Sequence, residues 1–316
     1  MDISIVVPIY NEEENIQALY VELKGVLSEL SLSSELIFVD DGSSDRSLVL
    51  LEEIQAGDSS VEVISFRKNF GQTAAMTAGF DHAHGDIIIT MDGDMQNDPH
   101  DIPKLIEKLN KGYDVVTGWR FHRKDPFLSR RLPSKIANKL ISWITGVSLH
   151  DYGCTLKAFR REVTENIRLY GEMHRFIPAI ASGMGISIAE IKVNHRPRQF
   201  GTSKYGISRT IRVVLDLMTV KFMLSYGTRP LHVFGVLGFA ASMAGFLIAL
   251  IMTFQRQFYG VPLGDRPLLL LAVLLVFIGI QFITIGLLAE LVVRTYHESQ
   301  RKPIYYIRKI IGRKRV

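Results

Sequence analysis

Two long apolar runs constrain this chain most, because each is long enough to cross a lipid bilayer. They cover Leu231–Phe254 and Pro267–Ala289, and neither contains Asp, Glu, Lys or Arg. A helix needs roughly 20 predominantly apolar residues to span the hydrocarbon core of a membrane. With a short polar segment between them, the two runs predict a transmembrane hairpin within residues 231–293, whose helices cover about 231–254 and 267–291.

Basic residues on both sides of this hairpin predict its orientation. The chain has a net charge of +5, and residues 294–316 are rich in Lys and Arg. Because such residues collect on the cytoplasmic side, we expect both termini in the cytoplasm and the protein in the cytoplasmic (inner) membrane as a multi-pass protein. Residues 294–316 would form a basic cytoplasmic tail and residues 207–230 an amphipathic juxtamembrane segment. The tail fits anionic lipid of the bilayer better than nucleic acid, which we do not expect as a partner.

Residues 1 to about 120 alternate apolar strands with amphipathic helices. This alternation predicts an α/β domain with a doubly wound, Rossmann-like, mostly parallel sheet, which we expect to extend over residues 1–206 in the cytoplasm. The single cysteine, Cys154, excludes an intrachain disulfide and fits a reducing compartment. The expected strands are Ile3–Val7, Glu35–Val39, Val61–Phe66, Asp86–Met91 and Asp114–Thr117, and the expected helices cover 13–30, 45–56, 72–83 and 99–111.

Polar clusters follow three of these strands, at the point where each strand ends. They are Pro8–Glu12, Asp40–Ser43 and Asp92–Asp94. The carboxyl ends of parallel strands meet at one edge of a sheet, and open α/β sheets bind their ligands there. We therefore expect the three clusters to converge.

The last of these clusters, Asp92-Gly93-Asp94, suggests a metal site. If the strand continued, its period of two would point both carboxylates to the same side. Two close like charges need a cation between them, and oxygen ligands suit Mg²⁺ or Mn²⁺. Gln96 offers a further neutral oxygen. The alternative is a solvated turn, since Asp-Gly-Asp is ordinary loop composition, and these residues alone leave both interpretations open.

Two common nucleotide-binding motifs are absent from the sequence. No Gly-x-Gly-x-x-Gly follows the first strand, and no Gly-Lys-Ser/Thr triplet marks a P-loop. A nucleotide site would instead use acids and a metal. Asp40 or Asp41 could accept hydrogen bonds from a base or a ribose, while a metal on Asp92 and Asp94 neutralised a diphosphate.

Several segments together resemble the family 2 glycosyltransferases of the GT-A fold, namely Val6–Glu12, Val39–Asp45 and Asp92–Gln96. The fuller pattern is similar to the polyprenyl-phosphate monosaccharide transferases, the dolichyl-phosphate mannose synthase branch. It looks most like the bacterial undecaprenyl-phosphate 4-deoxy-4-formamido-arabinose transferases. The resemblance covers nearly the whole chain, including the hairpin. It is carried further by Arg67–Gln72, Asp151–Cys154 and Phe200–Tyr205.

This resemblance implies an inverting, metal-dependent enzyme that moves one sugar from a nucleotide sugar to polyprenyl or undecaprenyl phosphate, for modification of cell-envelope glycans. A UDP-linked donor fits the bacterial relatives. Mg²⁺ or Mn²⁺ would be the cofactor, held by Asp92, Asp94 and Gln96. By the same resemblance, Pro8, Tyr10, Glu12 and Asp41 would line the nucleoside pocket.

The acceptor side is implied by the resemblance as well. Arg120, Arg130 and Ser134 would hold the acceptor phosphate and count with Asp94 as catalytic residues. Lys204 would close over the phosphates of the bound nucleotide. Arg131 is an alternative to Arg130, because the basic loop is shorter here than in some relatives. From the residues alone, Arg120 and Arg130 fit a solvated basic loop better.

Three alternative functions are compatible with part of the same sequence pattern. A mannose synthase using GDP-mannose would share the same acidic clusters. A processive polysaccharide synthase is disfavoured, because the sequence lacks a Gln-x-x-Arg-Trp motif. A non-catalytic lipid-binding scaffold is disfavoured by the intact Asp41, Asp92, Asp94 and Gln96. A homo-oligomer is compatible with a two-span hairpin, since such hairpins often pack against copies of themselves.

Overall fold

The computed structural model describes residues 1–121, 138, 141–142, 145–167, 169, 173–197, 230–260, 262–263, 266–299 and 304–312. The chain divides into two compact units, one of Met1–Val220 with Pro303–Val316 and one of Lys221–Lys302. The predicted site residues Arg130, Ser134 and Lys204, with the alternative Arg131, lie outside the described residues. The same holds for the juxtamembrane segment 207–230, except Pro230.

The first unit is built on one sheet, and the five strands expected from the sequence are all present. The sheet has eight strands in the order β7-β5-β6-β4-β1-β2-β3-β8. Neighbours β1–β2, β2–β3, β1–β4 and β5–β7 are parallel, whereas β6 and β8 run antiparallel to their neighbours, so the sheet is mixed around a parallel centre. The strands are β1 (Ile3–Ile9), β2 (Ser34–Asp40), β3 (Val61–Phe66), β4 (Ile87–Thr90), β5 (Val115–Arg120), β6 (Lys157–Arg160), β7 (Ile188–Val193) and β8 (Ile307–Ile311).

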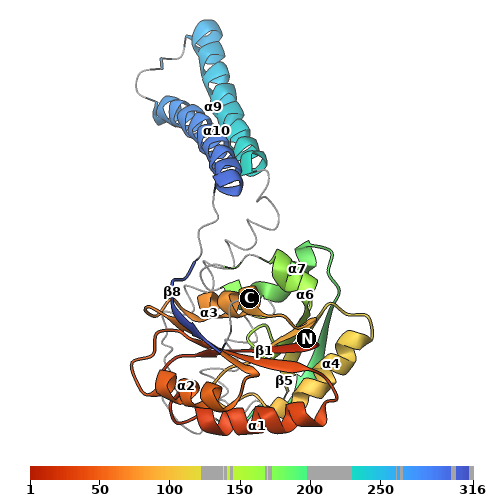
Figure 1. The fold of residues 1–316 in the computed structure, drawn as a ribbon. Helices are drawn as coiled ribbons and strands as arrows, with labels where there is room; N and C mark the ends of the chain where they lie inside the picture. The colour runs from red at the N-terminus through yellow and green to blue at the C-terminus, as the bar shows by residue number, and fades with distance from the viewer. Residues whose placement is uncertain are drawn as a thin grey trace. The chain divides into compact units, whose positions relative to one another are not determined.

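Helices cover both faces of this sheet, which explains why its central strands are buried along nearly their whole length. Every residue of β3 is buried, as expected for a strand enclosed on two sides. In Figure 1, α1 and α2 lie on one face, and α3, α6 and α7 lie on the other. The helical elements of this unit are α1 (Ile16–Glu29), α2 (Ser47–Gly57), α3 (Gln72–His82), η1 (Pro99–Asp101), α4 (Ile102–Asn110), α6 (Arg161–Asn166), η3 (Met173–Phe176) and α7 (Ile177–Gly183).

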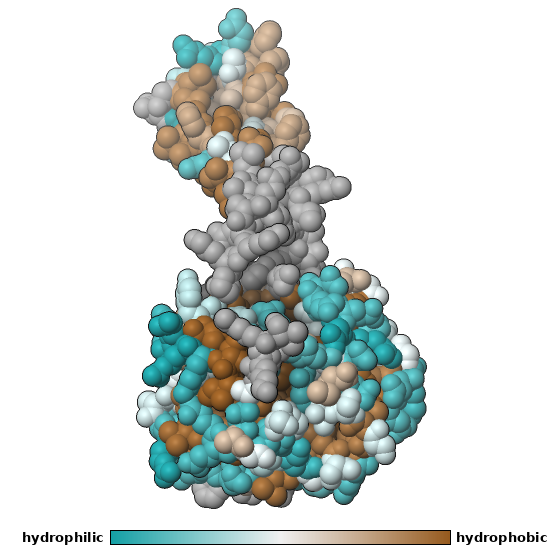
Figure 2. Space-filling model, in the orientation of Figure 1, coloured by the Kyte–Doolittle hydropathy of each residue, from teal (hydrophilic) through white to brown (hydrophobic). Residues whose placement is uncertain are grey.

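The second unit contains the two apolar helices, α9 (Pro230–Tyr259) and α10 (Pro267–Ser299). Both are long and apolar enough to cross a membrane, with mean hydropathies of 2.2 and 2.9 over their apolar stretches. Only 11% of each apolar stretch is buried, whereas the core helix of a soluble protein is mostly buried. Figure 2 shows apolar side chains spread over the outside of this pair. Both helices extend past the predicted ends at 254 and 291.

Glycines allow α9 and α10 to approach each other closely. A Cβ added to Gly238 would lie 2.5 Å from the carbonyl oxygen of Gly279, and one added to Gly245 would lie 2.5 Å from that of Ala272. Small residues at such positions let helix backbones pack against each other in an apolar environment. The two helices therefore form one tightly packed hairpin.

The predicted basic tail over 294–316 is corrected by the structure. Helix α10 continues to Ser299, and Ile307–Ile311 returns to the sheet as β8, antiparallel to β3. Lys309 forms an ion pair with Glu52 of α2, and Ile311 packs against the hydrophobic core. Charge alone suggested a tail, but alternate apolar residues in this segment fit the open edge of β3.

Candidate functional site

The three polar clusters converge at one edge of the sheet, as the sequence predicts. Strand β1 lies between β2 and β4 and is parallel to both, so Pro8, Asp41 and Asp92 stand at neighbouring strand ends. The chain proceeds from β1 to β2 and β3 on one side, and then places β4 on the other side of β1. This reversal is a topological switch point, where open α/β sheets form their ligand crevices.

Gly93 allows the Asp92–Asp94 segment to lie against the end of β1. A Cβ at this position would clash with the side chain of Ile9 and lie 3.3 Å from the carbonyl oxygen of Pro8. Strand β4 ends at Thr90, and Met95 takes a left-handed conformation with φ of 60°. The two carboxylates are therefore brought together by a bend, and not by the continued strand with a period of two that the sequence suggested.

Two side chains orient the carboxylate of Asp92, and neither is among the site residues predicted from the sequence. Gln72 Nε2 donates to Oδ1 at 2.7 Å, and Thr155 Oγ1 donates to Oδ2 at 2.7 Å. Asn97 Nδ2 donates in turn to Thr155 Oγ1 at 2.9 Å. Gln72 opens α3 at the same sheet edge, which is a signal that the sequence offered. Thr155 comes from a distant loop and has no comparable local signal.

Burial and charge repulsion make this site suited to a cation. Burial, followed by repulsion from Asp94, raises the pKa of Asp92 to about 6. Asp94 is itself only 6% exposed, and its Oδ1 accepts a hydrogen bond from the backbone N–H of Gln96 at 3.1 Å. Two neighbouring carboxylates, with an amide residue two positions after the second, are a donor set that fits Mg²⁺ or Mn²⁺. The predicted metal ligands Asp92 and Asp94 thus lie close together, and the backbone of Gln96 contacts Asp94.

Two positively charged side chains, Arg120 and Lys157, lie near the carboxylate of Asp92. The guanidinium of Arg120 binds the carboxylate of Asp151, with Nε to Oδ2 at 2.6 Å and Nη2 to Oδ1 at 2.9 Å. Burial opposes the charge on Arg120, but Asp151 and then Asp92 raise its pKa above the usual value. Lys157 is fully buried, donates to the carbonyl oxygen of Cys154 and has its pKa lowered by burial. The predicted acceptor residue Arg120 therefore belongs to the buried charge cluster around Asp92.

Asp41, predicted in the nucleoside pocket, binds backbone amides. Its Oδ1 accepts from the N–H of Phe70 at 2.6 Å, and its Oδ2 accepts from the N–H of Gly71 at 2.9 Å. Burial is the main cause that raises its pKa to about 6. The neighbouring Asp40 bonds the backbone N–H of Ser43 and the hydroxyl of Ser65, so it holds the turn after β2.

The loop after β1 carries the other predicted nucleoside residues, and side-chain bonds tie it to the loop after β2. Pro8, Tyr10 and Glu12 are partly exposed at the sheet edge. Glu12 Oε2 accepts from Asn15 Nδ2 at 2.7 Å, and the N–H of Glu12 donates to Ser47 Oγ at 2.9 Å. Asn11, with φ of 53°, accepts from the N–H of Ser44 at 2.8 Å. These contacts fix a surface beside Asp41 without closing it.

A second group of acidic residues lies next to this site but is already neutralised. Glu22, Asp98 and His100 bring potential ligand atoms within 4.8 Å of one another. The guanidinium of Arg196 binds Glu22 at 2.6 and 2.8 Å and Asp98 at 2.7 Å. The backbone N–H of Arg196 also donates to the carbonyl oxygen of Gln96 at 2.9 Å. This cluster therefore braces the segment that follows Asp94.

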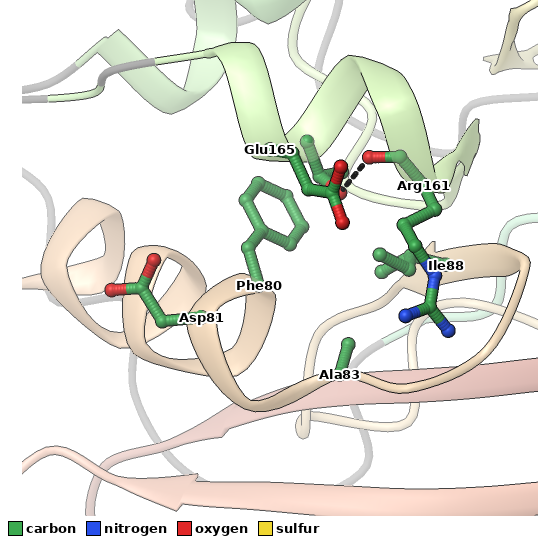
Figure 3. Close-up of a pocket in the computed structure, with 7 residues that line it drawn as sticks. Phe80, Asp81, Ala83, Ile88, Arg161 and Glu165 are labelled. Carbon is green, nitrogen blue, oxygen red and sulfur yellow. Dashed lines mark hydrogen bonds between the residues drawn. The ribbon is translucent and has the colours of Figure 1, made fainter.

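A shallow pocket of about 200 Å³ lies apart from the candidate site. Figure 3 shows Phe80 and Ala83 from the end of α3 facing Arg161 and Glu165 of α6 across it. Its floor includes Ile88, near the beginning of β4, whereas Asp92 follows the end of that strand. The pocket is thus no part of the site at the switch point.

Comparison with known proteins connects this site to a family. The family model described as glycosyl transferase family 2 matches residues 4–168. The dodecaprenyl-phosphate galacturonate synthase of Rhizobium johnstonii is 45% identical over 314 residues, which cover 98% of this chain and 93% of that protein. The undecaprenyl-phosphate 4-deoxy-4-formamido-L-arabinose transferase of Shewanella sediminis is 40% identical, over 98% of this chain and 92% of that protein.

Solved structures agree with the fold. Glucosyl-3-phosphoglycerate synthase from Mycobacterium tuberculosis, in complex with Mn²⁺, uridine diphosphate and phosphoglyceric acid, superposes with a TM-score of 0.54 at 20% identity. The match covers 71% of this chain and 78% of that chain. At this identity the likeness shows a shared GT-A architecture and no more. Together with the family match over the switch-point site, these findings show that the chain belongs to glycosyl transferase family 2.

Proposed function

We propose that this protein transfers a single sugar from a nucleotide sugar to undecaprenyl or another polyprenyl phosphate at the membrane surface, for modification of cell-envelope glycans. The observation that carries the proposal is the match over 98% of the chain, hairpin included, to proteins named as polyprenyl-phosphate sugar transferases. The carboxylates at the switch point supply a donor site in the same chain.

In this proposal the acceptor phosphate is itself the nucleophile. A phosphate oxygen of the lipid attacks the anomeric carbon of the sugar, the bond from that carbon to the diphosphate breaks, and the nucleoside diphosphate leaves. An in-line displacement of this kind inverts the anomeric configuration. Because a phosphomonoester is already anionic at neutral pH, the enzyme needs no strong general base. Positioning and electrostatic stabilisation then carry most of the catalysis.

The residues at the donor end have matching roles in this proposal. Asp92, Asp94 and Gln96 would hold Mg²⁺ or Mn²⁺, which when bound supplies positive charge to the leaving diphosphate. Gln72 and Thr155 fix the direction of the Asp92 carboxylate. Pro8, Tyr10 and Glu12 would line the nucleoside pocket, with Asp41 shaping it through Phe70 and Gly71. A uridine nucleotide is favoured, by analogy with the uridine diphosphate in the complex of similar fold.

The residues at the acceptor end are proposed from the family resemblance. Arg120, Arg130 and Ser134 would bind the lipid phosphate, and Lys204 would cover the phosphates of the donor. Arginine suits this task because its planar fork is permanently charged and binds phosphate in a bidentate manner.

The membrane arrangement is proposed from topology. Residues 1–206 and strand β8 would form the catalytic domain, residues 207–230 the juxtamembrane segment, and residues 231–293 the hairpin. Since β8 pairs with β3, the segments before and after the two helices belong to one folded unit. A chain that crosses a bilayer twice returns to the side it left, so this pairing supports a hairpin with both flanking segments on one side of the membrane. The basic residues around the hairpin favour the cytoplasm as that side.

The test uses the purified full chain with undecaprenyl phosphate, Mg²⁺ or Mn²⁺, and separate UDP- and GDP-linked sugars. We expect one nucleotide sugar to yield a lipid-phosphate-linked monosaccharide. The double variant Asp92→Asn with Asp94→Asn should lose transfer by more than about a hundredfold, since even outer residues of metal sites contribute 10–100-fold. Asp86→Asn, at the other end of β4, is the matched control and should retain transfer. Transfer by the double variant would contradict the metal mechanism.

A further inference from the structure

The loop between β3 and α3, residues Arg67–Gly71, connects the candidate site to the C-terminal strand. Strand β3 ends at Phe66 and α3 begins at Gln72. The proposed mechanism gives no role to the C-terminal residues that contact this loop. Its contacts come from two sides.

On one side the loop is fixed to the donor end of the sheet. The carboxylate of Asp41 accepts hydrogen bonds from the amides of Phe70 and Gly71. Gly42, with φ of +68°, touches the loop backbone so closely that a Cβ would lie 2.5 Å from the carbonyl carbon of Lys68. Gln72, the first residue after the loop, donates from Nε2 to Asp92 Oδ1 at 2.7 Å. A shift of this loop would therefore move groups that contact Asp41, in the predicted nucleoside pocket, and Asp92, a predicted metal ligand.

On the other side the loop is fixed to residues that precede β8. The N–H of Arg67 donates to the carbonyl oxygen of Tyr306 at 3.0 Å. The ring of Tyr305 stacks on Phe66 with centroids 5.1 Å apart, and the ring of Tyr306 lies 5.9 Å from that of Phe70. Phe66 and Phe70 also meet edge to face at 5.8 Å. Four aromatic rings thus join the loop to the C-terminal segment.

Tyr305 also contacts the helix that follows the loop. The residue is 8% exposed, and its hydroxyl donates to Asp81 Oδ2 of α3 at 2.8 Å. It therefore bridges the strand before the loop and the helix after it. Aromatic pairs of this geometry contribute beyond the area that they bury, so this bridge restrains both ends of the loop.

We propose that Tyr305 and Tyr306 are positioning residues for the nucleotide-sugar donor. They clamp the Arg67–Gly71 loop, so that the strand returning from the hairpin sets where Asp41 and Gln72 hold the donor end of the site. The inference rests on the proposed function, because it assigns the loop to donor binding. It assigns no contact with the acceptor lipid.

The experiment compares full-length Tyr305→Ala, Tyr306→Ala and Tyr306→Phe with the unchanged protein. Arg308→Ala is the matched control, because Arg308 is exposed in β8 at the register shift opposite Ser65 and Phe66. Hydrogen–deuterium exchange of the peptide covering residues 67–72 is measured first. Binding of UDP or GDP with Mn²⁺ is measured next, without lipid acceptor, followed by the KM values for donor and acceptor.

We expect faster exchange in residues 67–72 and about tenfold weaker nucleotide binding in both alanine variants, the scale of outer residues that orient a binding site. The donor KM should rise, whereas the acceptor KM and the exchange of β1 and β2 stay unchanged. Tyr306→Phe and Arg308→Ala should behave like the unchanged protein.

The proposal is overturned if exchange in residues 67–72 stays the same, or if donor and acceptor KM rise together with faster exchange across β1 and β2. A protein that binds UDP or GDP but transfers no sugar to the lipid would refute the proposed acceptor. In that case exchange and nucleotide binding would still decide the role of the two tyrosines.

Discussion

Arg120 and Asp151 form a two-point ion pair beside the candidate metal ligands, with their nitrogen and oxygen atoms 2.6 and 2.9 Å apart. Both side chains are largely buried, at 14% and 6% exposed. Asp151 thereby takes one edge of the arginine fork, and a ligand phosphate could use only the remaining N–H groups. The pair fixes the orientation of Arg120 before any ligand arrives.

Breaking this pair should be costly. In Asp151→Ala the guanidinium of Arg120 stays buried without its carboxylate, and we expect about 3–5 kcal/mol loss of unfolding free energy. Thermal or denaturant unfolding of the purified protein measures it. Glu107→Gln removes an exposed helical ion pair with Lys111 and should leave the unfolding midpoint unchanged. Equal unfolding midpoints for the two variants would show that Arg120 does not need Asp151 for the stability of the fold.

Removing the groups that orient Asp92 should weaken divalent-ion binding. Gln72→Ala and Thr155→Val each delete one hydrogen bond to the carboxylate, and we expect a 10–100-fold rise in the Mn²⁺ concentration for half-maximal transfer. Titrating the initial rate with Mn²⁺ gives this value. Thr164→Val is the control, because its hydroxyl donates to the carbonyl oxygen of Arg161 within α6 and has no role in orienting Asp92. An unchanged Mn²⁺ requirement in both variants would rule out this role.

Asp41 should make a pH-dependent contribution to stability. Burial raises its pKa from 3.8 to about 6 in the folded protein. Between these values the folded state binds more protons than the unfolded state, so this contribution is fully present below about pH 4 and lost as the pH rises through about 6. In Asp41→Asn the contribution is absent. On acidification from pH 7 to 4, the unfolding midpoint of the native protein should therefore rise relative to that of the variant. A difference between the two midpoints that does not change with pH would contradict this.

The close contact of α9 and α10 should tolerate no larger side chain. A Cβ at Gly279 would overlap Ser242 and the carbonyl oxygen of Gly238. We expect Gly279→Leu to destabilise the hairpin by about 1–3 kcal/mol, as overpacking commonly does, and to lower the unfolding midpoint in detergent. Ile280→Leu changes an adjacent side chain that is 53% exposed, and its midpoint should match that of the native protein. A midpoint preserved in Gly279→Leu would mean that the helices separate in solution.

The strands with strong apolar patterns were predictable from the sequence, and β3 has the expected bounds Val61–Phe66. The antiparallel strands were not. Strand β6 is only four residues long and carries a charge at each end, so no periodicity marks it. Strand β8 lies among basic residues, and its partner β3 is remote in the chain. Local patterns report burial, but they do not report which distant edge a short strand will meet.

The candidate site divides in the same way. Asp41 and Asp92 could be placed because they follow buried strands, and strand order brings such ends together. The contact between Thr155 and Asp92 spans 63 positions and depends on how β6 pairs with β4. Asp41 was predicted to line the nucleoside pocket, and its bonds to the amides of the loop after β3 were not foreseen. A residue type indicates what a side chain can bind, whereas the fold determines which of its partners is nearby.

The pairing of β8 with β3 also imposes an order on folding during synthesis. Ile311 aligns with Val63 in the register of the two strands, so the chain must leave the ribosome as far as Ile311 before this edge of the sheet is covered. Both apolar helices emerge in the interval and can enter a bilayer while the edge of β3 is still open. Contacts of such long sequence separation form late in folding. The domain near the N-terminus is therefore completed only by a strand that is made after both apolar helices.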